Sequence, residues 1–257
     1  MEVIAIDAGP GMVDASRFVR DNRTSGNSPG GGLAGVRRLS TEFSIFSVPG
    51  KGTVVLSRVW APAAYAPHAQ SPTVHLQHAG VCLAAPGHEV SGAAWGIRIT
   101  PSKASLIVCD GGGAGIASSN SSAVATNLFS ELRSNPSELL RRARYLNQQR
   151  ADASVAFGDF DAKAGTILLV GAGTVSCRIV DAQGHATALD ATAGAEVKER
   201  WPDGATVILH SAGIRGDWRL DDVPSLLLRD PAVIAGWLLR DHANAEEDKA
   251  IVVLKRS

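Results

Sequence analysis

The stretch that decides the fold is Ala104-Ser-Leu-Ile-Val-Cys-Asp-Gly-Gly-Gly-Ala-Gly115. Its apolar run, 104–109, predicts a buried strand that ends at Asp110, and the glycines after it predict a tightly bent loop. A helix is expected next, over 117–132, because apolar residues recur there at a spacing of four. A carboxylate at a strand end beside glycines suits a hard cation held by oxygen ligands, and it suits equally well a solvated cap at a strand–helix corner.

The composition limits the class of protein. The 257 residues are 45% hydrophobic, which is enough for a substantial core, and 25 basic side chains balance 25 acidic ones. A neutral chain is a poor candidate for nonspecific nucleic-acid or membrane binding, so neither partner is expected. The apolar runs are too short to span a bilayer, and the N-terminus lacks the basic region of a signal peptide. The scattered Cys82, Cys109 and Cys177 indicate reduced thiols in a cytoplasmic protein.

The first 60 residues alternate strands with glycine-rich loops. A strand over 3–6 leads directly into Asp7-Ala-Gly-Pro-Gly-Met12, and a polar, glycine-rich loop follows over 21–32. A short helix is expected over 33–39. Residues 43–60 predict a hairpin whose turn is Gly50-Lys-Gly-Thr53.

Residues 3–59 resemble the C-terminal half of a GHKL-type ATPase domain, in particular the small serine kinases of anti-sigma partner switching. The family's preceding helix, which carries a magnesium-holding Asn and a Glu base, has no counterpart in this sequence. We therefore expect 1–60 to be a partial, vestigial ATP-binding segment without kinase activity, and ATP is not expected as a cofactor. The resemblance assigns the vestigial nucleotide positions to Asp7, Gly9, Gly11, Met12, Gly30, Gly31, Gly32, Leu33, Gly35 and Thr53.

The rest of the chain predicts an α/β sandwich. Residues 61–79 begin with an Ala/Pro-rich stretch and are expected to form a linker. The order of elements after it indicates layers built on mostly antiparallel sheets. Strands are expected over 96–100, 105–109, 153–159, 166–171, 176–180, 206–210 and 249–255, with helices over 117–132, 137–149, 224–228 and 231–239.

Residues 80–257 resemble a SpoIIE-type member of the PPM metal-dependent serine/threonine phosphatases. The resemblance rests on ordered landmarks, among them Gly87 to Trp95, Val108 to Gly115, Leu209 to Ile214 and Glu247 to Val253. It implies the α-β-β-α sandwich of that family, preceded by the partial GHKL α/β half-domain. It also implies two Mg²⁺ or Mn²⁺ ions that activate a water, and hydrolysis of phosphoserine or phosphothreonine on a phosphorylated, anti-sigma-antagonist-like regulatory protein.

The resemblance also assigns the metal ligands, and half of the carboxylates are missing. Asp110, the Gly111 carbonyl and Asp248 match the family's pattern, whereas Ala93 and Ala212 stand where the pattern has Asp. No catalytic residue beyond the metal ligands is expected. Other acidic residues are candidates to replace the lost ones, namely Glu89, Asp217 and Asp241.

The sequence leaves two main functions open. One is a weak metal-dependent protein phosphatase, because the family landmarks extend over the whole domain. The other is an inactive pseudophosphatase that binds or sequesters a regulatory partner, because one carboxylate and carbonyls hold a dication poorly at each site. A third reading is that the gene product is decaying.

Overall fold

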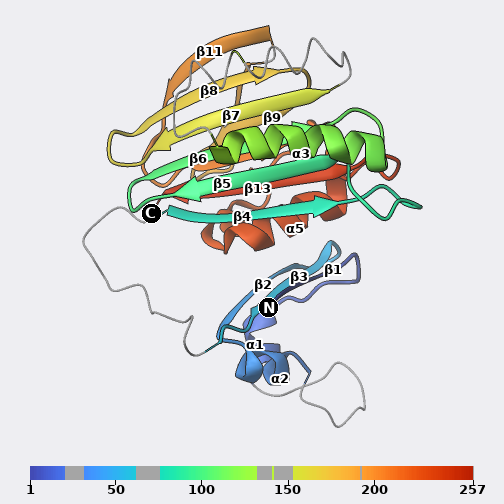
Figure 1. Cartoon of the computed structure of the whole chain (residues 1–257). Coiled ribbons are helices and arrows are strands. Elements are labelled where there is room, and N and C mark those ends of the chain that lie inside the picture. Colours follow the sequence, from blue (N-terminus) through green and yellow to red (C-terminus); the bar gives the residue numbers. More distant parts are fainter. Residues whose placement is uncertain (21–31, 62–75, 132–140, 142–152, 192, 257) are drawn as a thin grey trace.

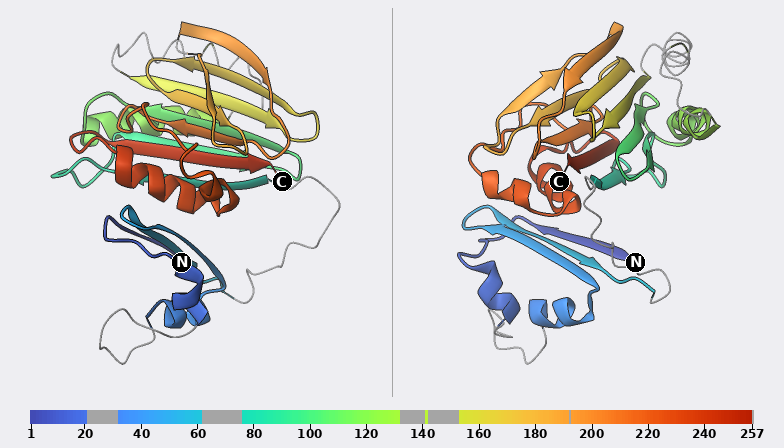
Figure 2. Two further views of the ribbon diagram at one scale, coloured as in Figure 1. Left: turned by 180° about the vertical axis from the view of Figure 1, so that it is seen from behind. Right: turned by 90° about the vertical axis from the view of Figure 1, so that its left-hand side faces the viewer.

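The computed structural model describes residues 1–20, 32–61, 76–131, 141, 153–191 and 193–256. These residues form a small N-terminal unit and a larger unit, which lie side by side in all views (Figures 1 and 2). Within these ranges no helix combines the length and the apolar character needed to cross a membrane.

The N-terminal unit is a three-stranded antiparallel sheet with two short helices. The strand order is β1-β3-β2, so the central strand is the second arm of the predicted hairpin. The helices lie on one face of this N-terminal sheet, away from the larger unit (Figure 2). The elements are β1 (Glu2–Asp7), α1 (Ala15–Arg20), α2 (Gly32–Leu39), β2 (Glu42–Val48) and β3 (Gly52–Arg58).

The larger unit is a sandwich of two five-stranded antiparallel sheets. The sheet that we call the α5-side sheet has the order β10-β9-β12-β13-β4, and the α3-side sheet has the order β11-β8-β7-β6-β5. Its elements are β4 (Leu76–Leu83), β5 (Ala93–Ile99), β6 (Lys103–Asp110), α3 (Ile116–Glu131), β7 (Ser154–Asp161), β8 (Thr166–Ala172), β9 (Ser176–Val180), β10 (Ala186–Leu189), β11 (Ala193–Arg200), β12 (Thr206–His210), the 3₁₀ helix η1 (Pro224–Leu228), α5 (Pro231–His242) and β13 (Lys249–Arg256).

Three hydrophobic layers hold the sandwich together, and one of them packs Phe129 of α3 against Ile107 and Phe157 of the α3-side sheet. Between the sheets, inward-facing side chains such as Leu106, Leu169 and Val252 form one core. Outside the α5-side sheet, α5 and η1 form a second core that also includes Phe46, Val54 and Leu56 of the N-terminal sheet. The helix α5 therefore lies between the N-terminal sheet and the sandwich, whereas α3 covers the opposite outer face (Figure 2).

The expected α/β sandwich with mostly antiparallel sheets is confirmed. The strands predicted around 105–109, 206–210 and 249–255 are β6, β12 and β13, and the predicted helix 117–132 is α3. One expectation is corrected: β4 begins at Leu76, inside the stretch 61–79 expected to be a linker, and it pairs with β13 from Leu76 to Leu83. The short helix α1 and the edge strands β10 and β11 were not predicted. The helix expected over 137–149 lies almost wholly outside the described residues.

Candidate metal centre

The first half of the candidate site is a row of residues across the ends of three strands. In β5, β6 and β7, Ala93 pairs with Asp110, and Asp110 pairs with Ser154. Directly opposed residues project from the same face of a sheet, so an Asp at position 93 would have faced Asp110. Ala93 is buried instead, at 2% exposure. The Asp110 carboxylate accepts a hydrogen bond from the Gly112 N–H at 3.1 Å, within its own glycine loop.

The second half is Asp248, at the start of β13. Its side chain is buried, and each of its two oxygens accepts a hydrogen bond from a backbone N–H far away in the sequence. The Ala85 N–H donates to Oδ1 at 2.6 Å, and the Gly92 N–H donates to Oδ2 at 2.6 Å. Charge-assisted hydrogen bonds of this kind are about twice as strong as neutral ones. Asp248 therefore fastens the loop before β5 to the start of β13.

Glycines allow the two halves to approach each other. A Cβ on either Gly92 or Gly111 would overlap with Ser118 of α3. The Gly92 carbonyl also accepts hydrogen bonds from the Gly111 N–H at 2.9 Å and from the Ser122 hydroxyl. Among the described residues, the buried Ser118 Oγ has no hydrogen-bond partner. The loop residue Gly92 thus links Asp248 to the Asp110 loop.

The third landmark of the site is the turn after β12, and it carries no acid. Ala212 is exposed, and its neighbour Ser211 is buried and fixed against the start of β13. The Ser211 N–H donates to the Ala250 carbonyl at 2.9 Å, and the Ser211 Oγ accepts from the Ala250 N–H at 3.0 Å. The turn is therefore fixed next to Asp248, although Ala212 supplies no carboxylate.

The same turn contains a histidine whose role sequence reasoning missed. His210 is buried, and its Nε2 lies 3.1 Å from the Trp218 Nε1. Since the indole N–H can only donate, Nε2 accepts this bond, and Nδ1 must carry the proton that it donates to the Ser211 carbonyl at 2.9 Å. Burial lowers the pKa of His210 to about 4, so the imidazole is neutral at pH 7. His210 and Trp218 therefore form a buried structural pair.

The acids suggested as replacements do not join the site. Asp217 pairs with His242 of α5 at 3.3 Å, and Asp241, itself in α5, pairs with Arg240 at 2.7 Å. Glu89 is exposed on the loop before β5. Within the described ranges no three His, Cys, Asp or Glu side chains gather in a way that could hold a metal ion. The donor set of these residues does not fit two divalent cations.

A thiol lies close to both retained carboxylates, which the sequence did not predict. The Cys82 Sγ of β4 donates to the Ala93 carbonyl at 2.8 Å. Burial raises the pKa of Cys82, and the negative charges of Asp248 and Asp110 act in the same direction. The side chain is therefore a neutral thiol at pH 7, and neutral thiols are poor metal ligands.

The nucleotide-like positions of the N-terminal segment have structural roles. Asp7 accepts a bond from the Gly9 N–H at 2.8 Å, and the Met12 N–H donates to the Ser47 Oγ at 2.8 Å. Gly11 has a φ of +66°, and a Cβ there would overlap with the Val48 carbonyl. Thr53 is buried and pairs with Asp7 across the sheet. Gly32, Leu33 and Gly35 lie on α2, whereas Gly30 and Gly31 lie outside the described residues.

Comparisons with known proteins agree with this two-part organisation. No family model matches the chain. Over 60 residues, 23% of this chain, it is 40% identical to the serine/threonine-protein kinase RsbT of Bacillus subtilis (strain 168), and it spans 45% of that kinase. The structure resembles RsbX in complex with magnesium, with a TM-score of 0.60 and 17% identity over 71% of this chain and 96% of RsbX.

A second solved structure covers more of the chain. The PP2C phosphatase domain of SpoIIE from Bacillus subtilis, with a fragment of its regulatory domain, matches with a TM-score of 0.54 and 14% identity. The match covers 81% of this chain and 68% of the SpoIIE structure. Identities this low establish the fold alone. The chain therefore has the fold of the PPM phosphatases, joined to a segment similar in sequence to part of the kinase RsbT.

Proposed function

We propose that this protein is a pseudophosphatase: a PPM-fold module that binds a phosphorylated regulatory protein of a bacterial partner-switching system without metal-dependent turnover. The fold and the similarity to RsbT support the setting. The alanines at 93 and 212 support the loss of metal-dependent phosphate hydrolysis. In this proposal the domain limits are 1–60, a linker from 61 that ends before β4, and the PPM-fold domain, and the protein works in the cytoplasm.

The observation that carries the proposal is the bonding of Asp248. Both of its oxygens accept backbone N–H groups at 2.6 Å, from Ala85 and Gly92. The positive ends of two N–H dipoles thus point at the Asp248 carboxylate, which a metal ion would need as its ligand. Hydrogen bonds from backbone donors satisfy a buried carboxylate, so this site is stable without a metal ion.

The charge of the site points the same way. Mg²⁺ loses its water reluctantly and is bound through carboxylates in octahedral geometry. Two ions carry four positive charges, whereas the retained Asp110 and Asp248 supply two negative ones. Positions 93 and 212 are both Ala, so neither adds a carboxylate to Asp110 and Asp248.

A second candidate is a weak phosphatase that uses Mn²⁺ or Mg²⁺. The specific observation in its favour is that Asp110 and Gly111 remain at the end of β6, beside a glycine loop. An ion held there would be bound weakly, because most of its ligands would be carbonyls and water.

Hydrolysis of p-nitrophenyl phosphate in the presence of Mn²⁺ separates the two candidates. The proposal predicts that the native chain and the Asp110→Ala variant give the same rate at every Mn²⁺ concentration. A double variant, Ala93→Asp with Ala212→Asp, shows that the assay detects a rebuilt site. Mn²⁺-dependent hydrolysis by the native chain that is lost in Asp110→Ala would establish the enzyme instead.

A further inference from the structure

The helix α5 is buried along almost its whole length. The nine residues from Pro231 to Leu239 are all buried, and they include the bulky Trp237. A helix on the surface of a domain buries one stripe of side chains, whereas a helix that is apolar all round belongs to an interior. In this protein β4 and β13 cover one side of α5, and β1 and β3 of the N-terminal sheet cover the other (Figure 2).

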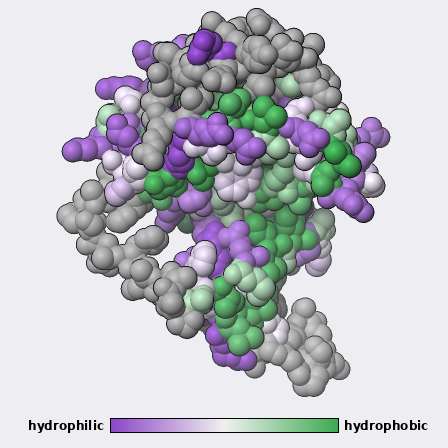
Figure 3. Space-filling model, viewed as in Figure 1, coloured by the Kyte–Doolittle hydropathy of each residue, from purple (hydrophilic) through white to green (hydrophobic). Residues whose placement is uncertain are grey.

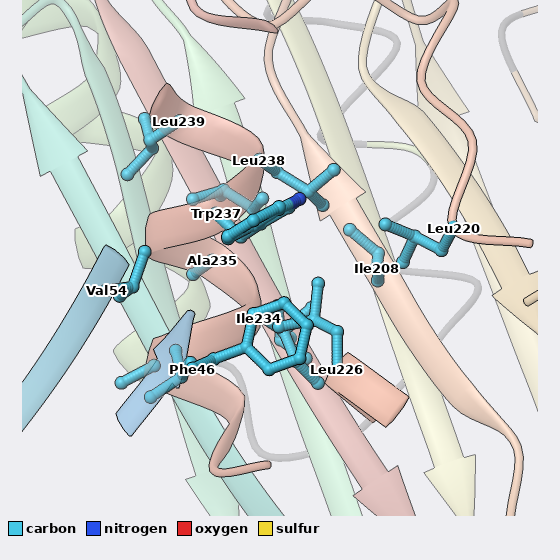
Figure 4. Close-up of a cluster of buried hydrophobic side chains, with 14 of the residues drawn as sticks. Phe46, Val54, Ile208, Leu220, Leu226, Ile234, Ala235, Trp237, Leu238 and Leu239 are labelled. Atoms are coloured by element: carbon cyan, nitrogen blue, oxygen red, sulfur yellow. The ribbon is translucent and has the colours of Figure 1, made fainter. Parts of the chain in front are cut away.

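The contact between α5 and the N-terminal sheet has the close packing of a core. A Cβ on Gly236 would lie 3.0 Å from Val54 Cγ1 and 3.2 Å from Ile4 Cγ2, so the glycine lets the strands approach the helix. Phe46 meets Trp237 edge to face, with ring centroids 4.8 Å apart. Figure 4 shows Phe46 and Val54 pointing from the N-terminal strands towards α5. Val54 is 0% exposed.

An ion cluster centred on the buried Arg58 crosses the same contact. Arg58 of β3 donates to Asp230 through Nη1 at 2.6 Å and through Nη2 at 3.1 Å, and it also pairs with Glu2 and Glu42. Asp230 is the N-cap of α5 and accepts the Ala232 N–H at 2.8 Å. Separating the units would remove the cation from Asp230, whereas Arg58 would keep Glu2 and Glu42 of its own unit.

We propose that the N-terminal segment is a permanent structural layer of the PPM-fold domain, with α5 as a core helix shared by both. The kinase-like segment then unfolds together with the sandwich and does not detach as a separate regulatory module. A partner that binds the segment has the α1–α2 side and the sheet edges available, because α5 fills the other face. Hydrophobic side chains are visible on the surface of the segment in Figure 3, and Val36 and Leu39 of α2 are among the exposed ones. This role is independent of whether the metal site is active.

Native-state hydrogen exchange of the full chain tests the proposal. Slowly exchanging amides of β3 and of β13 should report the same free energy of opening and the same dependence on denaturant, since both would open in one global event. Exchange of β3 amides by a much easier opening, with β13 still protected, would overturn the proposal.

A pair of valine variants tests whether a change in the N-terminal sheet destabilises the sandwich. Val54→Ala removes buried side-chain atoms at α5, and it should speed the global exchange of β13 amides by about tenfold or more. Val13→Ala is the control, because Val13 is 92% exposed and should leave that exchange unchanged. If Val54→Ala accelerates exchange in the N-terminal strands alone, the two units are separate and the proposal is wrong.

Discussion

Two regions of this molecule hold a carboxylate away from most solvent, partly buried at Asp230 and fully buried at Asp248, and they compensate its charge in different ways. Around α5, Asp230 faces the guanidinium of Arg58 from the N-terminal sheet. At the candidate metal centre, both oxygens of the buried Asp248 accept backbone N–H groups, from Ala85 and Gly92. The comparison teaches that the molecule compensates one carboxylate with a side-chain cation and the other with backbone dipoles.

The largest expected effect comes from removing the cation of the α5 cluster. Burial opposes the charge of Arg58, but bonds to Asp230 and Glu2 outweigh it and hold the Arg58 pKa above its usual value. Arg58→Met should lower the free energy of unfolding by about 3 kcal/mol, since it strands partly buried carboxylates. Urea denaturation measures this effect.

Lys51→Met is the matched control for Arg58→Met. Lys51 crosses the same contact to Asp222 at 2.5 Å, but both side chains are about half exposed. Exposed pairs contribute about 0–1 kcal/mol. Equal losses of unfolding free energy in Arg58→Met and Lys51→Met would mean that the Arg58 cluster contributes no more to stability than an exposed ion pair.

The next effect is a loss of stability in mild acid, caused by His210. Its pKa falls from 6.5 to about 4 on folding, so below pH 6.5 the unfolded chain binds a proton that the folded chain refuses. Stability should therefore be complete above pH 6.5 and decline towards pH 4, by roughly 3 kcal/mol in all. Denaturation midpoints across this range give the slope.

His210→Gln identifies the source of that slope. The variant is expected to be less stable at pH 7, because the more flexible amide does not reproduce both imidazole bonds, from Trp218 and to the Ser211 carbonyl, but its stability should change less between pH 6.5 and 4. Carboxylates whose pKa values are lowered from 3.8, such as Asp161, lose their contribution mainly below pH 4, so they add little to the slope in this range. An unchanged slope in His210→Gln would show that His210 is not its source.

A somewhat smaller loss of stability is expected at the candidate metal centre, from a change at Asp248. Asp248→Asn replaces one accepting oxygen with an NH₂ group, which cannot accept from Ala85 or Gly92. One buried N–H is then left unpaired, at a cost of about 2 kcal/mol. This loss should be the same with and without Mn²⁺ in urea denaturation. A loss that appears only when Mn²⁺ is present would show that Asp248 is a metal ligand.

The smallest effect concerns the thiols. Burial raises the pKa of Cys109 to about 12 and also raises that of Cys177, so both should resist alkylation in the folded protein. Cys82 is half-buried and should react first, but slowly, at pH 7. Mass spectrometry after timed iodoacetamide treatment gives the order, and rapid modification of Cys82 would contradict the neutral thiol inferred beside Asp110 and Asp248.

Much of the fold follows from local sequence, and the exceptions have physical causes. The strand that ends at Asp110 and the last strand are apolar runs with clear boundaries, so both were predicted. β4 contains Gln77, His78 and Gly80, and it lies at a sheet edge, so its sequence lacks the apolar signal of a central strand. β10 and β11 are edge strands too, and their sequences are rich in Ala and polar residues.

The family resemblance singled out Asp110 and Asp248 as candidate ligands, together with the alanines at 93 and 212, but nothing in the sequence indicated how Asp248 is bonded. The donors to Asp248 lie 163 and 156 residues away, and no local pattern indicates them. The shared burial of α5 left a trace in the sequence, because Pro231 to Leu239 is apolar all round. What covers its second face depends on β3, from a different part of the chain.

Titration calorimetry with Mn²⁺ tests most directly the central claim that the metal site has been emptied. The native chain and the Ala93→Asp/Ala212→Asp double variant are titrated side by side, after circular dichroism has shown that both are folded. The account predicts no binding to the native chain at micromolar Mn²⁺ and measurable binding to the double variant. Micromolar binding by the native chain, abolished by Asp110→Ala, would contradict it.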